Sequence, residues 1–390
     1  MSDTLEACVI GAGAAGLAAA ITAAEQGVRV VVLERQARIG QSILKTGNGR
    51  CNLTNDAIGA ALPLGTYRNQ DFASNVLGRW DAAAVRAWFD ERGLMTEADE
   101  RGWVYPRTRM ANSVLDVLRH RIAELDVELR CECQPEHVES AGEGFVLHLA
   151  SGESLCSRAV ILAHGGSRSV DIGGLSYQET APILGPLGTD TAAIRGLDGV
   201  RVSAQLSLSR NERELFCEYG ELLFRNYGLS GIVAFNLSRY ARRGDHISID
   251  LFPEDTEDGL AAFLGARRES LGGYDTQSFY DGMLHPRIGR LFRDSYANSH
   301  RLAHALKHWQ VRMNAAPKPE QAQVLRGGYQ VAAFRADRLE AYDYPGLFAA
   351  GECLDVDGPC GGYNLHWAWA SGITAGYAAA AFSSSRFPSD

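Results

Sequence analysis

The sequence lacks an excess of positive charge and lacks the cysteine pattern of a secreted domain. Lysine and arginine number 38 against 47 aspartates and glutamates, and the formal net charge is −9. The chain therefore has no overall field that would attract nucleic acid or an anionic membrane. Its eight cysteines include no CxxC pair, which favours reduced thiols in a cytoplasmic protein over a disulfide framework.

No segment has the character of a signal peptide or membrane span. The uncharged run 7–24 is long enough to be considered as a span. However, acidic rather than basic residues precede it, and Gly11, Gly13 and Gly16 interrupt it. We interpret the run as a buried strand followed by a small-residue helix. Repeats, low-complexity segments and long linkers are also lacking, and 390 residues with 46% hydrophobic composition predict two or three domains.

The same run contains a dinucleotide-binding turn. Ala7–Ile10 is an apolar strand, Gly11–Gly16 spells GAGAAG, and Leu17–Glu25 is an alanine-rich helix. In this pattern the first glycine permits the turn, the second lets the backbone approach a pyrophosphate, and the third lets the helix pack on the strand. Glu34 follows the next β-branched strand, where a carboxylate accepts hydrogen bonds from a ribose diol. This acid disfavours NADP and leaves FAD and NAD open.

The composition of three further segments predicts ordered structure near a ligand. Lys45–Asn55 is polar and glycine-rich and predicts an ordered loop. Trp103–Arg107 leads into a helix predicted from about residue 112. Near the C-terminus, Gly346–Asp355 predicts a buried strand that runs into a turn, and Gly361–Trp367 opens a small-residue helix.

These motifs resemble those of the BaiN/RdsA-type family of bacterial FAD-dependent oxidoreductases, which includes aminoacetone oxidase. The resemblance spans nearly the whole chain. It rests on five segments in the family's order, namely the loop ending GxGRCNxTN (Gly47–Asn55), YPR before SVL (Tyr105–Arg107 and Ser113–Leu115), FxxxGLSG (Phe224–Gly231), GLFAAGExLD (Gly346–Asp355) and GGYNL (Gly361–Leu365).

The resemblance implies a non-covalent FAD site built from both ends of the chain. The helix that begins near Tyr363 would direct its N–H groups at the N1–C2=O edge of the flavin, and Tyr105, Tyr363 and Asn364 are the candidate catalytic residues. The implied cofactor-binding residues are Gly11, Gly13, Ala14, Ala15, Gly16, Glu34, Arg35, Lys45, Gly47, Gly49, Arg50, Cys51, Asn52, Cys133, Ala163, Gly165, Gly166, Gly351, Glu352, Gly361, Gly362, Tyr363, Asn364 and Leu365.

Departures from the family pattern gather on the predicted substrate side. His164 stands where the family has threonine, and His366 stands where glutamine is commoner. Arg225 and Asn226 replace the family's Thr-His before GLSG. FAD binding is therefore carried over to this chain, whereas substrate identity is not.

The predicted fold class is α/β, with a discontinuous Rossmann-type FAD-binding domain and an inserted β-barrel-like part that carries a small helical subdomain. Residues 1–189 and 334–390 would form the FAD-binding domain, and residues 190–333 the insertion, with the helical subdomain at about 255–315. Within the insertion we expect strands at Val200–Leu208, Glu212–Tyr219, Glu221–Arg225 and Asp245–Leu251, and helices at Asp258–Arg268 and His300–Met313.

The expected function is hydride transfer between flavin N5 and a small amine or enone-like molecule. With no second GxGxxG in the sequence, NAD(P)H would be at most a transient electron donor, and oxygen could serve as acceptor. The alternatives are an NAD-dependent dehydrogenase that uses the same turn and a non-catalytic flavin-binding or electron-transfer protein. No metal is expected, because Cys131 and Cys133 lack a second ligand pair. No nucleic-acid or membrane partner is expected because the chain is acidic, and the oligomeric state stays open.

Overall fold

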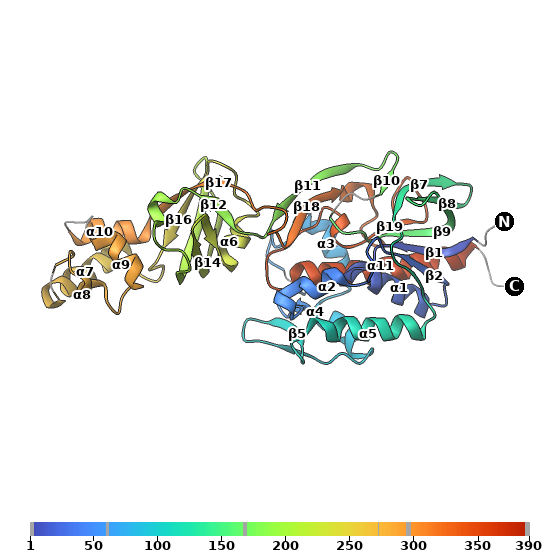
Figure 1. Ribbon diagram of the computed structural model, residues 1–390, viewed down its shortest axis with the longest axis horizontal. Coiled ribbons are helices and arrows are strands. Elements are labelled where there is room, and N and C mark those ends of the chain that lie inside the picture. The colour runs from blue at the N-terminus through green and yellow to red at the C-terminus, as the bar shows by residue number, and fades with distance from the viewer. Residues whose placement is uncertain (1–3, 60–61, 167–169, 272, 294–297, 387–390) are drawn as a thin grey trace. The chain divides into compact units, whose positions relative to one another are not determined.

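The computed structural model describes residues 4–59, 62–166, 170–271, 273–293 and 298–386 (Figure 1). Contacts divide the chain into two units, Met1–Ala181 with Val324–Asp390, and Pro182–Gln323. The second unit thus starts eight residues before, and ends ten residues before, the insertion expected from the sequence. The chain passes from the first unit to the second within β11 (Tyr177–Ile183) and returns to the first unit at the start of β18 (Val324–Tyr329). These two strands form a two-stranded sheet.

The first unit contains an eight-stranded sheet in the described part of the chain. The pairs β6–β2, β2–β1, β1–β9 and β9–β19 are parallel. The pairs β9–β8 and β8–β7 are antiparallel, and β10 is parallel to β7. The order is β10 (Asp171–Ile172), β7 (Pro135–Ala141), β8 (Gly144–Leu149), β9 (Ser154–Leu162), β1 (Leu5–Ile10), β2 (Val30–Leu33) and β6 (Glu128–Arg130), with β19 (Leu347–Ala349) also on β9. The central strands are apolar without alternation because both of their faces are buried.

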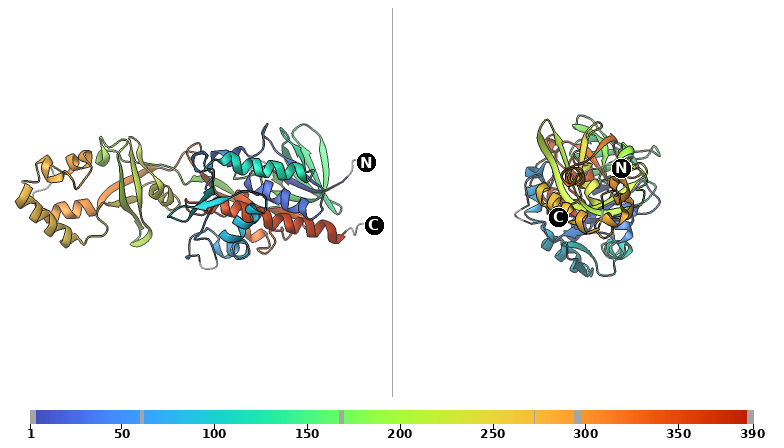
Figure 2. Two further views of the ribbon diagram at one scale, coloured as in Figure 1. Left: turned by 90° about the horizontal axis from the view of Figure 1, so that it is seen from below. Right: turned by 90° about the vertical axis from the view of Figure 1, so that its left-hand side faces the viewer.

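Two helices from opposite ends of the sequence pack closely on this sheet, α1 (Ala14–Glu25) and α11 (Tyr363–Arg386) (Figures 1 and 2). A Cβ on Gly372 would lie 2.3 Å from the Ala15 carbonyl oxygen, and one on Gly376 would lie 2.5 Å from that of Ala19. The two backbones therefore touch. No helix in the described residues is both long enough and apolar enough to cross a bilayer.

Smaller elements complete the first unit around this helix pair. The helices are α2 (Gln41–Lys45), α3 (Gln70–Leu77), α4 (Ala82–Asp90) and α5 (Ala111–Glu124). A three-stranded sheet has the order β3 (Thr54–Asn55), β5 (Trp103–Pro106) and β4 (Thr96–Ala98). The expected loop at Lys45–Asn55 is therefore partly regular, since it holds a 3₁₀ turn at Thr46–Gly49 and the strand β3.

The second unit is a closed antiparallel barrel with a helical part. The barrel order is β12 (Leu187–Thr189), β15 (Gly228–Ser230), β14 (Arg213–Arg225), β13 (Arg201–Arg210), β16 (His246–Asp250) and β17 (Trp309–Ala315). The helices are α6 (Ile232–Leu237), α7 (Glu257–Leu271), α8 (Gln277–Tyr280), α9 (Pro286–Arg293) and α10 (Ser299–Lys307). Alternating strand residues such as Leu206, Leu208, Ile247 and Ile249 fill the barrel core. The β-rich insertion with helices is confirmed.

Two expectations within this unit are wrong. The helix expected over His300–Met313 ends at Lys307, and residues 309–315 form β17. Trp309, Val311 and Met313 are buried and the residues between them are exposed, which is the period of a strand. The two strands expected at Glu212–Tyr219 and Glu221–Arg225 are a single strand, β14. Gly220 pairs with Ala204 of β13, so the strand pairing continues through the position where a break was expected.

The close contact between α1 and α11 can be tested with one glycine substitution inside the contact and one outside it. Gly376→Ala should destabilise the protein by about 1–3 kcal/mol, since the added methyl must displace the α1 backbone. Gly265→Ala, in α7, should be neutral or stabilise by up to about 1 kcal/mol, because the nearest atom to its Cβ is Ser299 Oγ at 3.9 Å. Denaturant unfolding followed by circular dichroism measures both. Equal stability of Gly376→Ala and wild type would refute the close contact.

Candidate active site

The turn between β1 and α1 uses its three glycines in different ways. Gly11 has φ +106°, and its Cβ would lie 2.5 Å from the Ala163 carbonyl oxygen. A Cβ on Gly16 would lie 1.8 Å from the Gly11 oxygen, so chain packing alone requires both glycines. By contrast, a Cβ on Gly13 would approach only Ser42 Oγ, at 3.1 Å. Gly13 also caps α1, so this face, bounded only by the movable Ser42 hydroxyl, lies beside unpaired N–H groups, as a pyrophosphate requires.

The carboxylate expected to hold a ribose lies next to this turn. Glu34 is buried at the end of β2, where Oε2 accepts from the Ala12 N–H at 2.7 Å and Oε1 accepts from the Gln36 N–H at 2.9 Å. Each oxygen keeps a second lone pair for a hydroxyl donor. The Cys133 N–H donates to the Glu34 carbonyl at 2.9 Å, and Arg35 is exposed. The structure therefore brings Glu34 and Cys133 together beside the glycine turn.

Two more predicted segments converge on the start of α1. A Cβ on Gly351 would lie 2.8 Å from Ala15 Cβ, and the Gly351 N–H donates to Ser371 Oγ at 2.8 Å. Ala14 and Ala15 are buried. The small side chains of this region thus let three chain segments meet around the turn.

Glu352 has a partner set that sequence reasoning did not foresee. Its carboxylate accepts from the Leu325 N–H at 2.7 Å and the Gly166 N–H at 3.3 Å. Burial raises the pKa of Glu352, and these two hydrogen bonds act in the opposite direction. A Cβ on Gly165 would lie 3.7 Å from Glu352 Oε2. Glu352 therefore joins the Ala163–Gly166 segment to β18.

The second group of predicted residues meets at the start of α11. Gly362 has φ +98°, and its Cβ would lie 2.4 Å from the Thr54 carbonyl oxygen. Asn55 Nδ2 donates to the Gly361 carbonyl at 2.9 Å, and a Cβ on Gly361 would lie 2.8 Å from Trp103 Nε1. Asn52, buried, accepts from the Gly362 N–H at 3.2 Å in the amide orientation that satisfies its neighbours. Packing on the 52–55 segment thus requires Gly362 whether or not a cofactor is present.

The loop before this segment presents an exposed edge and a buried thiol. Lys45, Gly47, Gly49 and Arg50 are exposed. Cys51 is fully buried, and burial raises the pKa of its thiol to about 12, against a weaker opposing hydrogen bond from Thr46. A protonated, enclosed thiol is a poor nucleophile. Cys51 therefore packs the loop in place.

Tyr105 combines burial with nearby positive charge. It lies in β5 and is 2% exposed. The Arg50 guanidinium lies 5.6 Å and the Arg109 guanidinium 4.6 Å from the centre of its ring. Burial raises the pKa of the Tyr105 phenol and outweighs the opposing effect of Arg50. The phenol is therefore protonated at neutral pH and can donate a hydrogen bond.

The other two predicted catalytic residues serve the loop before α11. Asn364 Oδ1 accepts from the Gly358 N–H at 2.8 Å, and its Nδ2 donates to the Gly358 carbonyl at 2.9 Å. The Tyr67 hydroxyl donates to the Tyr363 carbonyl at 2.9 Å, and the two rings pack edge to face. Leu365 packs against the core. Asn364 is thus a positioning residue that shapes the turn into α11.

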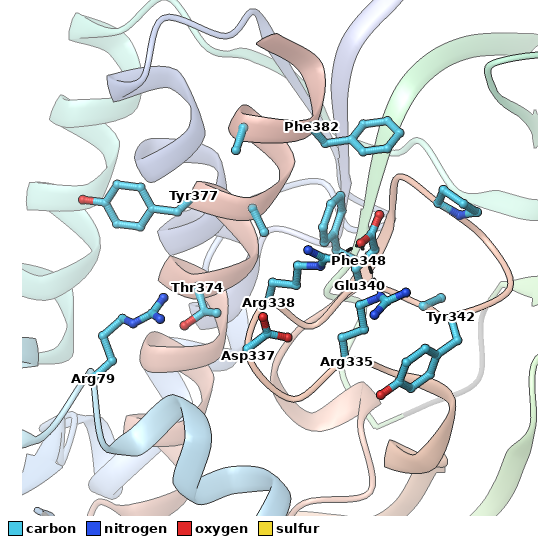
Figure 3. Close-up of a pocket in the computed structure, with 14 residues that line it drawn as sticks. Arg79, Arg335, Asp337, Arg338, Glu340, Tyr342, Phe348, Thr374, Tyr377 and Phe382 are labelled. Atoms are coloured by element: carbon cyan, nitrogen blue, oxygen red, sulfur yellow. Dashed lines mark ion pairs between the residues drawn. The ribbon is translucent and has the colours of Figure 1, made fainter. Parts of the chain in front are cut away.

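A different cavity lies far from these residues. About 670 Å³ in volume, it is lined by Arg335, Arg338, Glu340 and Tyr377, among others (Figure 3). Arg338 pairs with Glu340 at 2.9 Å. Tyr377 follows Tyr363 by fourteen residues, which is about 21 Å along α11. None of the predicted site residues lines this cavity.

Comparison with known proteins agrees with the motifs. The model of the HI0933-like protein Rossmann domain matches residues 5–378. The chain belongs to the HI0933-like family. It is 32% identical to the 3-dehydro-bile acid delta(4,6)-reductase of Clostridium scindens, over 95% of this chain and 98% of the relative. It is 26% identical to the ribosomal RNA dihydrouridine synthase of Escherichia coli, over 95% and 96%.

Among solved structures, a flavocytochrome c3 fumarate reductase aligns with a TM-score of 0.48 and 15% identity, over 98% of this chain and 79% of that one. The family match confirms the resemblance inferred from the five motifs. This HI0933-like protein is an FAD-dependent oxidoreductase with a Rossmann-type cofactor domain.

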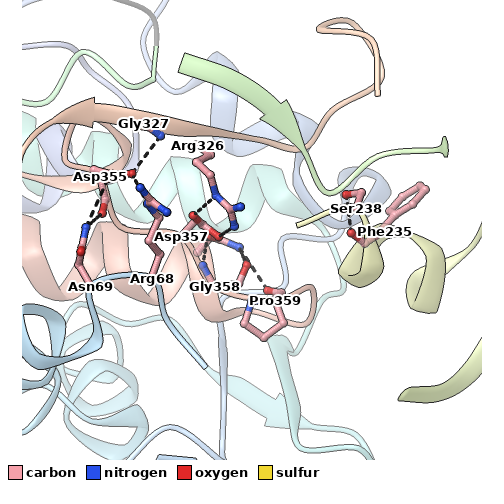
Figure 4. Close-up of polar contacts among 11 residues, drawn as sticks. Arg68, Asn69, Phe235, Ser238, Arg326, Gly327, Asp355, Asp357, Gly358 and Pro359 are labelled. Carbon is pink, nitrogen blue, oxygen red and sulfur yellow. Dashed lines mark hydrogen bonds and ion pairs between the residues drawn. The ribbon is translucent and has the colours of Figure 1, made fainter. Parts of the chain in front are cut away.

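Two buried acids were missed as parts of the HI0933-like site (Figure 4). Asp355 pairs with Arg68 Nε at 2.7 Å and accepts from the Gly327 N–H at 3.1 Å. Asp357 accepts two hydrogen bonds from Arg326, each 2.9 Å long. Both acids precede α11 and fix the 355–359 loop. The GExLD motif named Asp355, but its partners lie too far along the chain for any pattern to reveal them.

His366 is a third supporting residue that is not among the predicted site residues. Its Nε2 lies 2.8 Å from the Trp80 carbonyl and its Nδ1 lies 2.7 Å from Thr54 Oγ1. A carbonyl only accepts, so Nε2 carries the proton and Nδ1 accepts from the hydroxyl. Burial lowers the pKa of His366 to about 4. The imidazole is neutral near pH 7, and it positions Thr54 beside Gly362 instead of relaying protons.

Substitution of Gly13 tests where the cofactor binds in this HI0933-like protein. Gly13→Val should give protein without the yellow flavin colour, because the side chain fills the space beside the helix N-terminus. Its extended backbone accepts valine, so thermal stability measured on cofactor-free protein should stay near that of the wild type. The control Ser42→Ala should retain FAD. Full flavin absorbance in Gly13→Val would place the nucleotide elsewhere.

His366 predicts how stability depends on pH. The unfolded imidazole binds a proton below about pH 6.5, whereas the folded one does so only below about 4. Its contribution is complete above pH 6.5 and is lost as pH falls towards 4, by roughly 3 kcal/mol in total. Unfolding free energies measured across this range should show the loss, and His366→Gln should reduce the slope. An unchanged slope in His366→Gln would contradict the assignment.

Proposed function

We propose that this protein reduces a carbon–carbon double bond conjugated to a carbonyl group in a small organic molecule, with NAD(P)H as a transient electron donor. Three features of the chain fit FAD. A side chain on Gly13 would meet only Ser42 Oγ, each Glu34 oxygen keeps a lone pair for a hydroxyl donor, and the N-terminus of α11 has N–H groups to offer. When bound, FAD supplies two-electron chemistry at its isoalloxazine ring. The remaining argument concerns this chain's own residues.

The relatives favour enone-like substrates over amines. One is named for reduction at delta(4,6) of a 3-dehydro bile acid, and another for the formation of dihydrouridine. Both names describe saturation of a carbon–carbon double bond in a ring. An acidic chain with a net charge of −9 favours a small molecule over RNA as the substrate here.

Tyr105 is the observation that carries the proposal. Reduction of an enone requires a group that donates a hydrogen bond to the carbonyl oxygen, or a proton, as negative charge develops. The Tyr105 phenol is protonated at neutral pH, since burial raises its pKa above a usual value that is already alkaline, and the Arg50 guanidinium lies 5.6 Å from the centre of its ring. We assign Tyr105 as the donor and Arg50 as the group that stabilises the developing oxyanion.

The start of α11 bears on the other half of the reaction, in which the electron donor reduces the flavin. Gly361 and Gly362 bring the first turn of α11 against the 52–55 segment, and Asn364 holds the preceding loop. The helix is 24 residues long, and its first N–H groups carry a partial positive charge. Charge of that sign would stabilise a reduced, anionic flavin held there, which favours electron transfer from NAD(P)H to the flavin.

The sequence limits how NAD(P)H could bind. One GxGxxG turn is present and belongs to the FAD-binding unit. NAD(P)H would then bind transiently and leave before the substrate enters, which predicts ping-pong kinetics.

Anaerobic reoxidation tests the function. Chemically reduced holoprotein should be reoxidised by a cyclic α,β-unsaturated ketone and not by the saturated ketone. Tyr105→Phe should slow this step by about 10²–10⁴-fold, with FAD content unchanged because the substitution removes only the hydroxyl. The visible flavin absorbance in a stopped-flow instrument follows both reactions.

Tyr219→Phe, at an exposed position of β14, is the matched control and should react like wild type. A Tyr105→Phe variant with the wild-type rate would remove Tyr105 from the mechanism. Reduction of the oxidised flavin by amines, together with no reaction of the reduced flavin with enones, would overturn the proposed direction.

A further inference from the structure

Three potential metal ligands come together in the helical part of the second unit. His304 lies in the last turn of α10, His308 is the residue that follows this helix, and Glu257 is the first residue of α7. His304 Nδ1 lies 3.2 Å from Glu257 Oε2, and His308 Nε2 lies 3.3 Å from the same oxygen. The potential ligand atoms of all three lie within 4.8 Å of one another. Neither the flavin chemistry nor the family motifs use these residues.

These distances suit a tetrahedral ion. Zinc binds imidazole nitrogen and carboxylate oxygen at about 2.0–2.2 Å, which places ligand atoms of a tetrahedral site roughly 3.3 Å apart. Two histidines and one carboxylate are ligands that zinc, nickel and copper accept. The arrangement matches the three-ligand type of site, in which a fourth position is left for water or another small ligand.

The ligands are carried by helices whose other faces are anchored in the core. Leu302 and Leu306 of α10 and Leu260 and Leu264 of α7 are buried, and the two helices pack against each other (Figure 1). His308 follows the last residue of α10 with non-helical backbone angles, and its ring centre lies 4.7 Å from that of His304, with both side chains exposed. The three side chains can meet an ion with little movement of the backbone.

A cavity adjoins the cluster. It has a volume of about 790 Å³, and its lining includes Glu257, His304 and His308 together with His300, Phe292 and Trp309. His300 lies one further turn back on the same face of α10. An ion held by the three ligands would therefore lie at the wall of a cavity, where its fourth position is accessible to a small ligand.

We propose that Glu257, His304 and His308 form a binding site for one divalent transition-metal ion of the Zn²⁺ class, which links α7 to α10. The site is independent of the FAD domain, so its ligands can be removed without effect on flavin content. The sequence signal is the HxxxH spacing in the segment 304–308, whose carboxylate partner is 47 residues away.

Titration of untagged, metal-free holoprotein with Zn²⁺ tests the proposal. Isothermal calorimetry should show one equivalent bound. His304→Gln, His308→Gln and Glu257→Gln should each weaken binding by more than about tenfold. Zn²⁺ should raise the melting temperature of the wild type and leave that of Glu257→Gln unchanged, because the ion stabilises only the state that binds it.

His120→Gln is the matched control, since His120 is an exposed histidine on α5 far along the chain from the cluster. It should bind Zn²⁺ like wild type. The visible spectrum of the Co²⁺ complex distinguishes nitrogen and oxygen ligands from thiolates, which matters in a chain with eight cysteines. Thiolate bands, equal affinity of all variants, or no bound Zn²⁺ at millimolar concentration would overturn the proposal and leave an ion-pair cluster only.

Discussion

Backbone contact between α1 and α11 is the constraint on which the FAD domain depends. Gly372 and Gly376 lie against the carbonyls of Ala15 and Ala19, where any larger residue would force the helices apart. This contact brings the first and last parts of the chain into one unit. The N-terminal glycine turn and the start of α11 then belong to one rigid body, so two halves of a cofactor site more than 300 residues apart are held without a linker.

Around that contact, buried polar groups hold loops in place. Glu34 and Glu352 accept backbone N–H groups, Asp357 pairs with Arg326, and neutral His366 links Thr54 to Trp80. Each group is costly to bury without partners. Satisfied as they are, they make the loops around the site rigid before any ligand enters, which is what preorganised hydrogen-bond donors need.

Some site residues serve the fold as much as the chemistry. A side chain on Gly13 would meet only the movable Ser42 hydroxyl, so the identity of Gly13 points to a ligand, whereas a side chain on Gly362 would clash with the Thr54 backbone in the bare protein. Asn364 is a predicted catalytic residue, and in the structure its amide closes the Gly358 turn. Cysteine and histidine are often reactive in enzymes, but Cys51 and His366 are both buried and neutral here. A sequence motif therefore indicates the location of a site more reliably than it indicates the role of each residue in it.

The sequence by itself determined the glycine turn, the acid after β2, the family and the β-rich insertion, because turn stereochemistry and hydrophobic period act over a few neighbouring residues. It did not determine that α10 stops at Lys307, since the change from helical to strand periodicity depends on the barrel that receives Trp309. Only the tertiary structure decided that His366 meets Thr54 across 312 residues and that Glu257 meets His304 across 47. Such contacts leave no period or spacing in the chain, because they arise when separate elements pack.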